Sequence, residues 1–598
     1  MRRLAAAAAV AASLALPAGA AAAPPLPFGH ACVPQSGVLF CPTAADDQRV
    51  PTFDGVPLDV DVTLPGTGDG PFPTIVILHG FGADKTHFEA VNAEGLQASG
   101  TVKTSAYHNN NTFYAQRGYA VVNYSARGFG RSCGRADSRT SPGCDRGWLH
   151  LGDQRFEVRD TQHLLGLLVD QGVSQAGALG VTGESYGGGQ TQQLARLRNR
   201  VRMPDGSLVP WRSPNGTPLE IKAGWSRWGW SDLPYDLVPN GRFRDDRPYK
   251  VGQSYTPAGV KKQSYTDGLF LLAQITGLVA PAGAHPTADL NGWKAIIDTG
   301  EPYGGAARAV ARELTRFHSS VGVPGGSAPL LAQNGWRDEL FPATQALRTY
   351  SVLRGQQGAR VALQLGDVGH SAGSNKTGTD RLFNDQAAAW FDALLKGSGK
   401  PLANGTVTAL TSTCPATAPA RGPYRATRWA RLHPGRFVVR GGKRRQGVTS
   451  TGGNPATSKA FDQRSGGDAC KTVKRERARG TAIAERRVRR GFTMLGLPTV
   501  SATIRTRGRN GYVAARLWDV FGGKQRLVSR GVYRLRNGQK GKVAFQLFGN
   551  AYSFARGHRA KLELVGRDPD YLRTSNGKFS LRVTKLAVSL PTRQRKPR

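Results

Sequence analysis

Three serines stand in the pattern Gly-x-Ser-x-Gly, which places a serine on a tight turn between a strand and a helix: Ser132, Ser185 and Ser371. Ser132 and Ser185 each follow an expected strand, but only Ser185, after the strand 178–182, also precedes a plausible helix, which begins with small residues. The other two are followed by loop-like sequence, so no helix would carry their backbone. A serine on such an elbow attacks an acyl carbonyl once a base takes its proton. We therefore predict Ser185 as a nucleophile, and we interpret Ser132 as part of a structural turn.

A nucleophilic serine needs a base and an acid that orients the base. With this kind of elbow the partners follow in the chain order serine, acid, histidine. His370 has the right place in that order, and Asp338 follows the expected strand 329–332, at the end of which catalytic loops of a parallel sheet lie. We predict His370 as the base and Asp338 as the orienting acid, with Asp367 and Glu339 as the alternative acids.

The charge that develops on the substrate carbonyl oxygen needs fixed N–H donors. The segment Leu78-His79-Gly80-Phe81-Gly82 follows an early expected strand, and Tyr186 follows the nucleophile directly. We predict that the backbone N–H groups of Phe81 and Tyr186 form this oxyanion hole. The alternative interpretation of residues 78–82 is a plain turn from strand to loop.

Short apolar segments separated by helical patterns position these residues. Segments such as 74–78, 119–124 and 360–365 are continuously apolar, which is typical of parallel strands that helices cover on both faces. The sequence therefore predicts an α/β fold with a mostly parallel sheet. Residues 232–325 contain helical patterns but no obvious core strand, so we expect them to form a helical cap over the site.

Three aromatic residues at the end of the strand 221–225 and the start of the cap, Trp228, Trp230 and Tyr235, are candidates for lining a substrate pocket. The alternative is that they belong to the plain core.

The rest of the chain divides by composition. Beyond about residue 401, short alternating segments separated by Gly, Asn and Asp turns predict an all-β sandwich. At the N-terminus, two arginines, a short alanine-rich apolar stretch and small residues are typical of a cleaved export signal. The predicted parts are a signal peptide 1–23, a lead-in 24–47, a catalytic domain 48–400, a β-sandwich 401–590 and a basic tail 591–598.

The charge of the chain is concentrated in its last third. The 598 residues contain 81 basic and 41 acidic side chains, a net charge of +40. Residues 401–598 account for 43 and 8 of these, a net of +35, which leaves +5 for residues 1–400. This asymmetry indicates either a surface for an anionic polymer of the cell wall or a uniformly solvated basic coat. Export disfavours nucleic acid as the partner.

The six cysteines have none of the close spacings of a zinc site. An oxidising compartment permits disulfides, and the most local pairing is 32–41, 133–144 and 414–470, with the last bond inside the β-sandwich. Some free buried thiols are the alternative. We predict no metal and no cofactor. A nucleotide-driven role is excluded because Gly397-Ser398-Gly399-Lys400-Pro401 lacks the earlier glycine and the Ser or Thr of a phosphate-binding loop.

Several motifs together resemble those of the X-prolyl dipeptidyl-peptidase and cocaine-esterase-like α/β-hydrolases. They are residues 118–122, the turn Ala126-Arg127-Gly128-Phe129-Gly130-Arg131-Ser132, the elbow Gly183-Glu184-Ser185-Tyr186-Gly187-Gly188, residues 338–342 and Gly369-His370. The resemblance covers roughly residues 50–590 and implies an α/β-hydrolase with a C-terminal jelly-roll. It also implies a triad of Ser185, Asp338 and His370. Family members often place a tyrosine hydroxyl near the position of Phe81, which here offers only its backbone N–H.

The sequence thus predicts a secreted or extracytoplasmic serine hydrolase that cleaves an acyl ester or amide through an acyl-enzyme, without a membrane span. Two alternatives remain open. One is an X-Pro dipeptidyl-peptidase that acts on peptides. The other, from another class, is a protein that binds an anionic polymer and whose hydrolase activity is secondary.

Overall fold

The computed structural model describes residues 26–246, 258–370, 375–465 and 468–597. The predicted signal peptide, residues 1–23, and the elbow serine Ser371 lie outside the described residues. In the described part of the chain, no helix is both long and apolar enough to cross a membrane.

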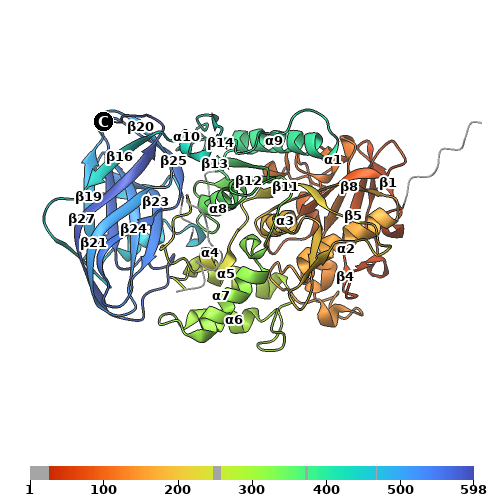
Figure 1. The fold of residues 1–598 in the computed structure, drawn as a ribbon, viewed down its shortest axis with the longest axis horizontal. Coiled ribbons are helices and arrows are strands. Elements are labelled where there is room, and N and C mark those ends of the chain that lie inside the picture. The colour runs from red at the N-terminus through yellow and green to blue at the C-terminus, as the bar shows by residue number, and fades with distance from the viewer. Residues whose placement is uncertain (1–25, 247–257, 371–374, 466–467, 598) are drawn as a thin grey trace, which may run out of the picture.

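An eleven-stranded sheet forms the centre of the hydrolase part of the molecule (Figure 1). Its middle strands, from β7 to β14 in spatial order, are parallel, and antiparallel strands flank them on both sides. The strands in spatial order are β1 (Val33–Gln35), β2 (Val38–Cys41), β5 (Val60–Pro65), β7 (Ala120–Tyr124), β6 (Phe72–Leu78), β8 (Ser174–Glu184), β11 (Ile221–Arg227), β12 (Leu330–Gly335), β13 (Val361–Gly366), β14 (Val407–Ala409) and β15 (Tyr424–Ala426).

Helices cover both faces of this sheet, and alternate side chains of each strand serve the two layers. Ile75 and Ile77 of β6 lie in the core cluster with α1 (Asn111–Gln116) and α9 (Thr377–Leu395). Val76 and Leu78 belong instead to the cluster that contains the remaining helices, α2 (Glu157–Asp170), α3 (Tyr186–Leu197) and α8 (Ala343–Arg354). The predicted parallel sheet, buried on both faces, is therefore confirmed.

In the described residues between β11 and β12, four helices form the expected cap, which lies along the lower side of the molecule in Figure 1. They are α4 (Leu233–Leu237), α5 (Gln263–Thr276), α6 (Leu290–Asp298) and α7 (Gly305–Phe317). The small elements outside the main layers are β3 (Val50–Pro51), β4 (Pro57–Leu58), β9 (Arg200–Arg202), β10 (Leu208–Pro210), α10 (Trp429–Leu432) and α11 (Pro455–Ala460).

The hydrolase sheet does not coincide with the predicted range 48–400 at either end. The lead-in supplies β1 and β2, which pair with β5. Beyond residue 400, β14 pairs with β13 and β15 pairs with β14. These added strands have only three or four residues each, so no sustained apolar run marks them in the sequence.

The C-terminal part is an all-β sandwich of two antiparallel sheets, as expected, at the blue end of Figure 1. The seven-stranded sheet contains β16 (Gly435–Arg440), β17 (Gln446–Thr449), β20 (Phe492–Gly496), β21 (Thr499–Gly508), β24 (Lys540–Gln546), β25 (Asn550–Phe554) and β27 (Phe579–Thr592). The five-stranded sheet contains β18 (Val473–Lys474), β19 (Ala482–Arg487), β22 (Tyr512–Phe521), β23 (Lys524–Arg534) and β26 (Arg559–Val565). A core of its own, including Phe437, Leu517 and Phe545, fills the space between the sheets.

A buried ion pair joins the sandwich to the hydrolase part. Arg530 on β23 donates from Nε to Oε1 of Glu339 at 2.8 Å and from its terminal nitrogen to Oε2. Its guanidinium lies 3.5 Å from the ring centroid of Tyr571. Trp336 and Ala551, from the two parts, belong to one hydrophobic cluster. The sandwich is therefore packed directly against the loop that follows β12.

All six cysteines are paired as the most local pairing predicts, and no free cysteine remains. The bond 414–470 differs from the expectation in its location. Cys414 lies between β14 and β15 of the hydrolase sheet, whereas Cys470 lies just before β18 of the sandwich. This disulfide therefore connects the two parts of the molecule and is not internal to the sandwich.

Candidate active site

Ser185 lies on a sharp turn between β8 and α3. Its backbone has φ 56° and ψ −110°, an unusual conformation for a residue with a side chain. A Cβ on Gly187 would come within 2.4 Å of the Leu78 carbonyl oxygen, and one on Gly183 within 2.7 Å of the Gly187 backbone. Only glycine fits at these positions, because the strand, the turn and the helix approach one another so closely.

The structure brings Ser185, His370 and Asp338 together in one chain of hydrogen bonds. The distance from His370 Nε2 to Ser185 Oγ is 2.7 Å, and the distance from His370 Nδ1 to Asp338 Oδ2 is also 2.7 Å. With Asp338 ionised, Nδ1 carries the proton and Nε2 is left to accept from the serine hydroxyl. This is the arrangement in which an imidazole can take a proton from a nucleophile.

Asp338 is held by backbone donors and is almost fully buried, with 1% of its surface exposed. Its Oδ1 accepts from the Phe341 N–H at 2.9 Å, and its Oδ2 accepts from the His370 N–H at 3.0 Å. Gly369 has φ +97°, and a Cβ there would lie 2.6 Å from Oδ2. The absence of a side chain on Gly369 thus lets the histidine loop close onto the carboxylate.

The two alternative acids do not contact His370. Both ring nitrogens of His370 are already occupied by Ser185 and Asp338, so neither is left for Asp367. Glu339 points to the sandwich, where Arg530 binds both of its oxygens. Burial raises the pKa of the Glu339 carboxyl, and the Arg530 charge opposes that shift.

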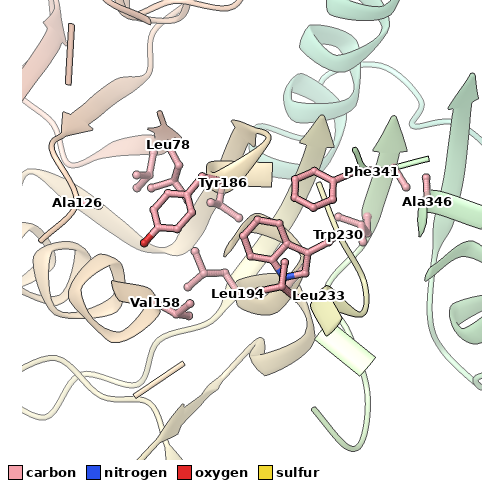
Figure 2. Close-up of a cluster of buried hydrophobic side chains, with 14 of the residues drawn as sticks. Leu78, Ala126, Val158, Tyr186, Leu194, Trp230, Leu233, Phe341 and Ala346 are labelled. Atoms are coloured by element: carbon pink, nitrogen blue, oxygen red, sulfur yellow. The ribbon is translucent and has the colours of Figure 1, made fainter. Parts of the chain in front are cut away.

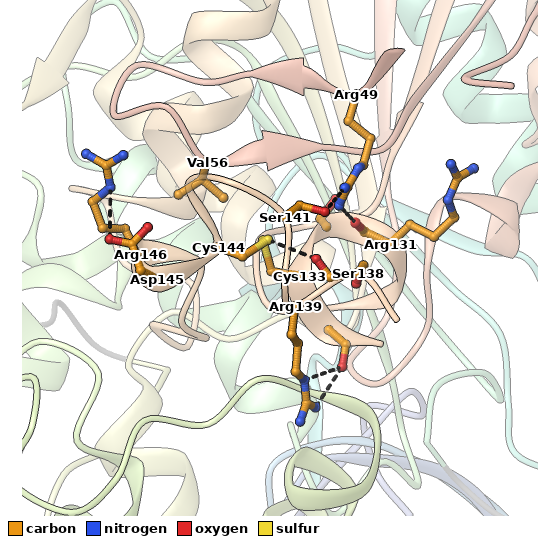
Figure 3. Close-up of a disulfide and its surroundings, with 12 residues drawn as sticks. Arg49, Val56, Arg131, Cys133, Ser138, Arg139, Ser141, Cys144, Asp145 and Arg146 are labelled. Carbon is orange, nitrogen blue, oxygen red and sulfur yellow. Dashed lines mark hydrogen bonds and ion pairs between the residues drawn. A yellow bond between two sulfur atoms is a disulfide. The ribbon is translucent and has the colours of Figure 1, made fainter. Parts of the chain in front are cut away.

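Ser132 is fully buried in the turn after β7 and is hydrogen-bonded as part of that turn. Its hydroxyl donates to the Ser125 carbonyl at 2.6 Å and accepts from the Asp59 N–H at 2.8 Å. The neighbouring Cys133–Cys144 disulfide closes the loop, and Arg49 donates to the Arg131 carbonyl at 2.7 Å (Figure 3). These contacts agree with the interpretation of Ser132 as structural.

The predicted oxyanion-hole segment follows β6 and lies against the elbow. The Gly187 N–H donates to the His79 carbonyl at 3.0 Å, which fixes this loop to the start of α3. His79 is buried, and burial lowers its pKa. Its Nε2 accepts from the Ala126 N–H at 2.9 Å. Within the described residues, neither the Phe81 nor the Tyr186 backbone N–H has a hydrogen-bond partner, so both are free to bind a ligand oxygen.

A histidine that the sequence analysis did not identify fixes the same loop. The Gly80 N–H donates to His87 Nδ1 at 3.0 Å, and His87 Nε2 lies 3.0 Å from Oε1 of Glu184. Glu184 directly precedes Ser185. The loop that carries Phe81 and the elbow that carries Ser185 are thus linked through one imidazole. Because the contact joins residues 97 positions apart, no local pattern indicates it.

A largely apolar cavity of about 160 Å³ opens beside Ser185. Aromatic rings line it near the nucleophile: Tyr186 lies 5.4 Å from Phe81 and 6.2 Å from Trp230, measured between ring centroids. Figure 2 shows Tyr186, Trp230 and Phe341 grouped in this part of the core. The cap adds apolar residues from α5, α6 and α7: Leu269, Phe270, Ala273, Leu290, Trp293, Ile297, Val310, Ala311 and Leu314.

Of the three predicted pocket aromatics, only Trp230 lines this cavity. Trp228 packs in a separate cluster with Val368, and the Arg227 guanidinium lies 4.5 Å from its ring centroid. Tyr235 lines a different, smaller cavity and lies under the Arg348 guanidinium. The prediction for Trp228 and Tyr235 is therefore corrected. The sequence analysis grouped Trp228, Trp230 and Tyr235 because they are close in sequence, but the chain turns between them, so their side chains point to different places.

Among the described residues, one cluster of acidic and histidine side chains has the spacing of potential metal ligands. Asp153, Glu313 and His318 bring ligand atoms within 4.8 Å of one another. However, Arg155 binds both carboxylates, so a protein cation already fills this cluster.

The buried carboxyl of Glu157 binds Tyr186, the first residue of the elbow helix α3. The Glu157 side chain accepts from the Tyr186 hydroxyl at 3.0 Å and from the backbone N–H groups of His150 and Asp153. Burial raises its pKa to about 7. The hydrogen bond to Glu157 thereby fixes the Tyr186 ring beside the nucleophile.

Comparison with known proteins agrees with this geometry. The family model of the X-Pro dipeptidyl-peptidase (S15 family) matches residues 54–202, which include the Ser185 elbow and the loop 78–82 that follows β6. No curated protein matches the chain in sequence.

Several solved structures share the fold over nearly the whole chain. A CocE/NonD family hydrolase from Staphylococcus aureus is 12% identical with a TM-score of 0.54, covering 93% of this chain and 94% of its own. An alpha-amino acid ester hydrolase is 15% identical with a TM-score of 0.54, covering 97% and 100%. An aminopeptidase from a marine sediment Thaumarchaeota archaeon is 14% identical with a TM-score of 0.53, covering 91% and 95%. At such identities the likeness concerns the fold. Together with the family match, it confirms the resemblance to the X-prolyl dipeptidyl-peptidase and cocaine-esterase-like hydrolases.

Proposed function

We propose that this serine hydrolase, related to the X-Pro dipeptidyl-peptidase (S15) family, is an extracytoplasmic esterase for substrates with an apolar acyl group. The observation that carries the proposal is the hydrogen-bonded chain Ser185–His370–Asp338 beside a largely apolar cavity. The three disulfides are consistent with a location outside the cytoplasm.

In the proposed mechanism, Ser185 Oγ attacks the acyl carbonyl while His370 Nε2 accepts the serine proton. Asp338 keeps the imidazole in the correct tautomer and stabilises its charged form. The N–H groups of Phe81 and Tyr186 stabilise the oxyanion. The imidazolium then gives its proton to the leaving alcohol or amine. Water, deprotonated by the same imidazole, attacks the acyl-enzyme and releases the acid, and the serine regains its proton.

The cavity lining favours an ester with an apolar acyl group over an X-Pro dipeptide. An X-Pro dipeptidyl-peptidase would need an anionic group for the substrate amine. Among the described residues that line the cavity, Asp298 is the one carboxylate, and it is bound by both Lys261 and Lys294. An engineered cavity of about 150 Å³ holds benzene. The cavity of about 160 Å³ therefore suits an acyl group of roughly that size.

A series of p-nitrophenyl esters with increasing acyl length, compared with X-Pro-p-nitroanilides, tests the substrate class. Each CH₂ that enters the cavity should raise kcat/KM about fourfold, from about 0.8 kcal/mol of burial, until the cavity is full. Ala311→Leu, which projects into the lining, should shift the optimum to a shorter acyl group. Faster cleavage of the nitroanilides than of every ester would favour the dipeptidyl-peptidase.

The nucleophile is tested separately. Ser185→Ala should lower turnover by on the order of 10⁴-fold or more and abolish labelling by a fluorophosphonate, while the protein keeps its cooperative unfolding transition. Ser132→Ala is the matched control, because it removes the other described elbow hydroxyl without touching His370. Retained labelling of the Ser185 variant would refute the assignment. Polymer binding through residues 401–598 does not use these residues and can coexist with hydrolysis.

A further inference from the structure

The strands of the seven-stranded sheet contain basic residues and no acidic ones. The five-stranded sheet, in contrast, carries Glu485, Asp519 and Glu563 on its strands. The basic residues on the strands of the seven-stranded sheet are Arg436, Arg440, Arg505, Arg507, Lys540, Lys542, Arg582 and Lys585. All eight are exposed, and none forms an ion pair with any residue that the structure describes. We call this set the basic face.

The centre of the basic face is a row of three cations on neighbouring strands. Lys540 on β24 is directly opposite Arg505 on β21, which is directly opposite Arg582 on β27. Arg507 and Lys542 extend the row along their strands at every second residue. Like charges directly opposite one another destabilise a sheet. Folding therefore gives no reason for this arrangement, whereas a polyanion laid across it would remove the repulsion.

The five-stranded sheet neutralises part of its positive charge with carboxylates on its own strands. Glu485 on β19 binds Arg475, Arg477 and Arg559. Within the same sheet, Arg516 lies next to Glu563 and binds Asp568. The strands of the seven-stranded sheet carry no such carboxylate, and Figure 1 shows β21, β24 and β27 of this sheet at one end of the molecule.

The chemistry of the basic face fits phosphate and not bases. Its exposed neighbours on the strands are small and polar, such as Ser501, Ser580 and Thr449. The aromatic residues of these strands, including Phe437 and Phe545, point into the core between the sheets. Single-stranded nucleic acids are bound by combining cations with aromatic rings on which bases stack. The described part of this sheet offers the cations alone.

We propose that the basic face binds a linear phosphodiester polymer without bases, of the polyol-phosphate kind found in cell envelopes. Strands lie about 4.8 Å apart, and every second residue of a strand is about 7 Å further along. An extended chain crossing β24, β21 and β27 therefore meets a cation at each strand. Arginine and lysine bind the phosphates, and the released counterions drive association. The hydrolase would thus be retained at the surface where its substrates diffuse.

The test uses the full chain and purified poly(glycerol phosphate), with binding measured by co-sedimentation or fluorescence anisotropy across a salt series. The face variant is Arg505→Thr/Lys540→Thr/Arg582→Thr, which keeps β-forming residues. At about 0.15 M salt each phosphate contact contributes roughly a fivefold factor, so the face variant should bind about 100-fold more weakly. The slope of log Kobs against log salt should fall in magnitude by about two to three.

The control variant removes the same charge from exposed arginines of the cap helix α7: Arg308→Gln/Arg312→Gln/Arg316→Gln. It should keep near-normal polymer binding. Turnover of a p-nitrophenyl ester, which the face variant should retain, reports that the protein is folded and does not depend on polymer binding.

Two results would overturn the proposal. Equal losses in the face and control variants would mean that only the net charge matters. Tighter binding of a single-stranded DNA oligonucleotide than of poly(glycerol phosphate) at equal phosphate concentration would assign the face to nucleic acid.

Discussion

Replacing Arg530 by methionine should destabilise the protein far more than a typical surface change. The Arg530 guanidinium donates two hydrogen bonds to Glu339 and a third to the Phe461 carbonyl at 3.1 Å, and the side chain is only 2% exposed. Without it, the Glu339 carboxylate is left buried without its cation. Breaking such a pair typically costs about 3–5 kcal/mol. The double variant Arg530→Met/Glu339→Leu removes both charges and should regain most of this loss.

Urea unfolding at pH 7 of the wild type, both single variants and the double variant measures the coupling free energy between the two side chains. We expect a coupling of about 3 kcal/mol, since the single variants leave a buried charge and the double variant does not. Esterase turnover provides a second readout, because Glu339 directly follows Asp338. A loss below about 1 kcal/mol in Arg530→Met, or additive effects in the double variant, would refute the argument that this pair is desolvated and coupled.

Three further outcomes are expected. His87→Leu removes the acceptor of the Gly80 N–H and should lower kcat about 10- to 100-fold with little change in KM. His87→Asn should restore part of this loss. An unchanged affinity for a phosphonate inhibitor would count against a role of His87 in the oxyanion hole. Burial raises the pKa of Glu157 to about 7, above its unfolded value, so ionisation of this carboxyl destabilises the folded state. Between about pH 4.5 and 8 the free energy of unfolding of the wild type should fall by about 3 kcal/mol relative to that of Glu157→Gln, measured by urea unfolding. A difference between the two proteins that does not change with pH would contradict this. Removing the Cys414–Cys470 bond, which spans 56 residues, should lower the free energy of unfolding by about 4 kcal/mol, because the unfolded chain gains loop entropy. Thiol titration of the denatured, unreduced wild type should find no free thiol.

The parts of the fold that local sequence determines could be predicted. The turn at Ser185 needs glycines on both sides, because the Leu78 backbone approaches it, and that need is visible in five consecutive residues. The apolar strands of the central sheet are recognisable because helices bury both faces of the sheet, so most positions of these strands are apolar. Asp338 and His370 follow from their places after expected strands and from the chain order, although only the structure gives their distances.

Features that depend on distant contacts could not be predicted. The contact between His87 and Glu184 links two loops that lie 97 residues apart. Trp228 and Trp230 are neighbours in sequence, yet a backbone turn sends one to the Val368 cluster and the other to the cavity. Strand β14 has three residues, too few for a periodic pattern, and its membership in the hydrolase sheet depends entirely on pairing with β13. In each case tertiary geometry, not local propensity, determines the outcome.

The ends of the large hydrolase sheet bear on how this protein resists self-association. A sheet edge exposes unpaired backbone groups that can template a strand from another molecule, and aggregation begins at such edges. Here one edge is β1, three residues with a central proline, next to the Cys32–Cys41 crosslink, and the other is β15, also three residues. Proline cannot donate a ladder hydrogen bond, and so short an edge offers little to pair with. The two edges of this eleven-stranded sheet therefore offer little unpaired backbone to a strand from another molecule.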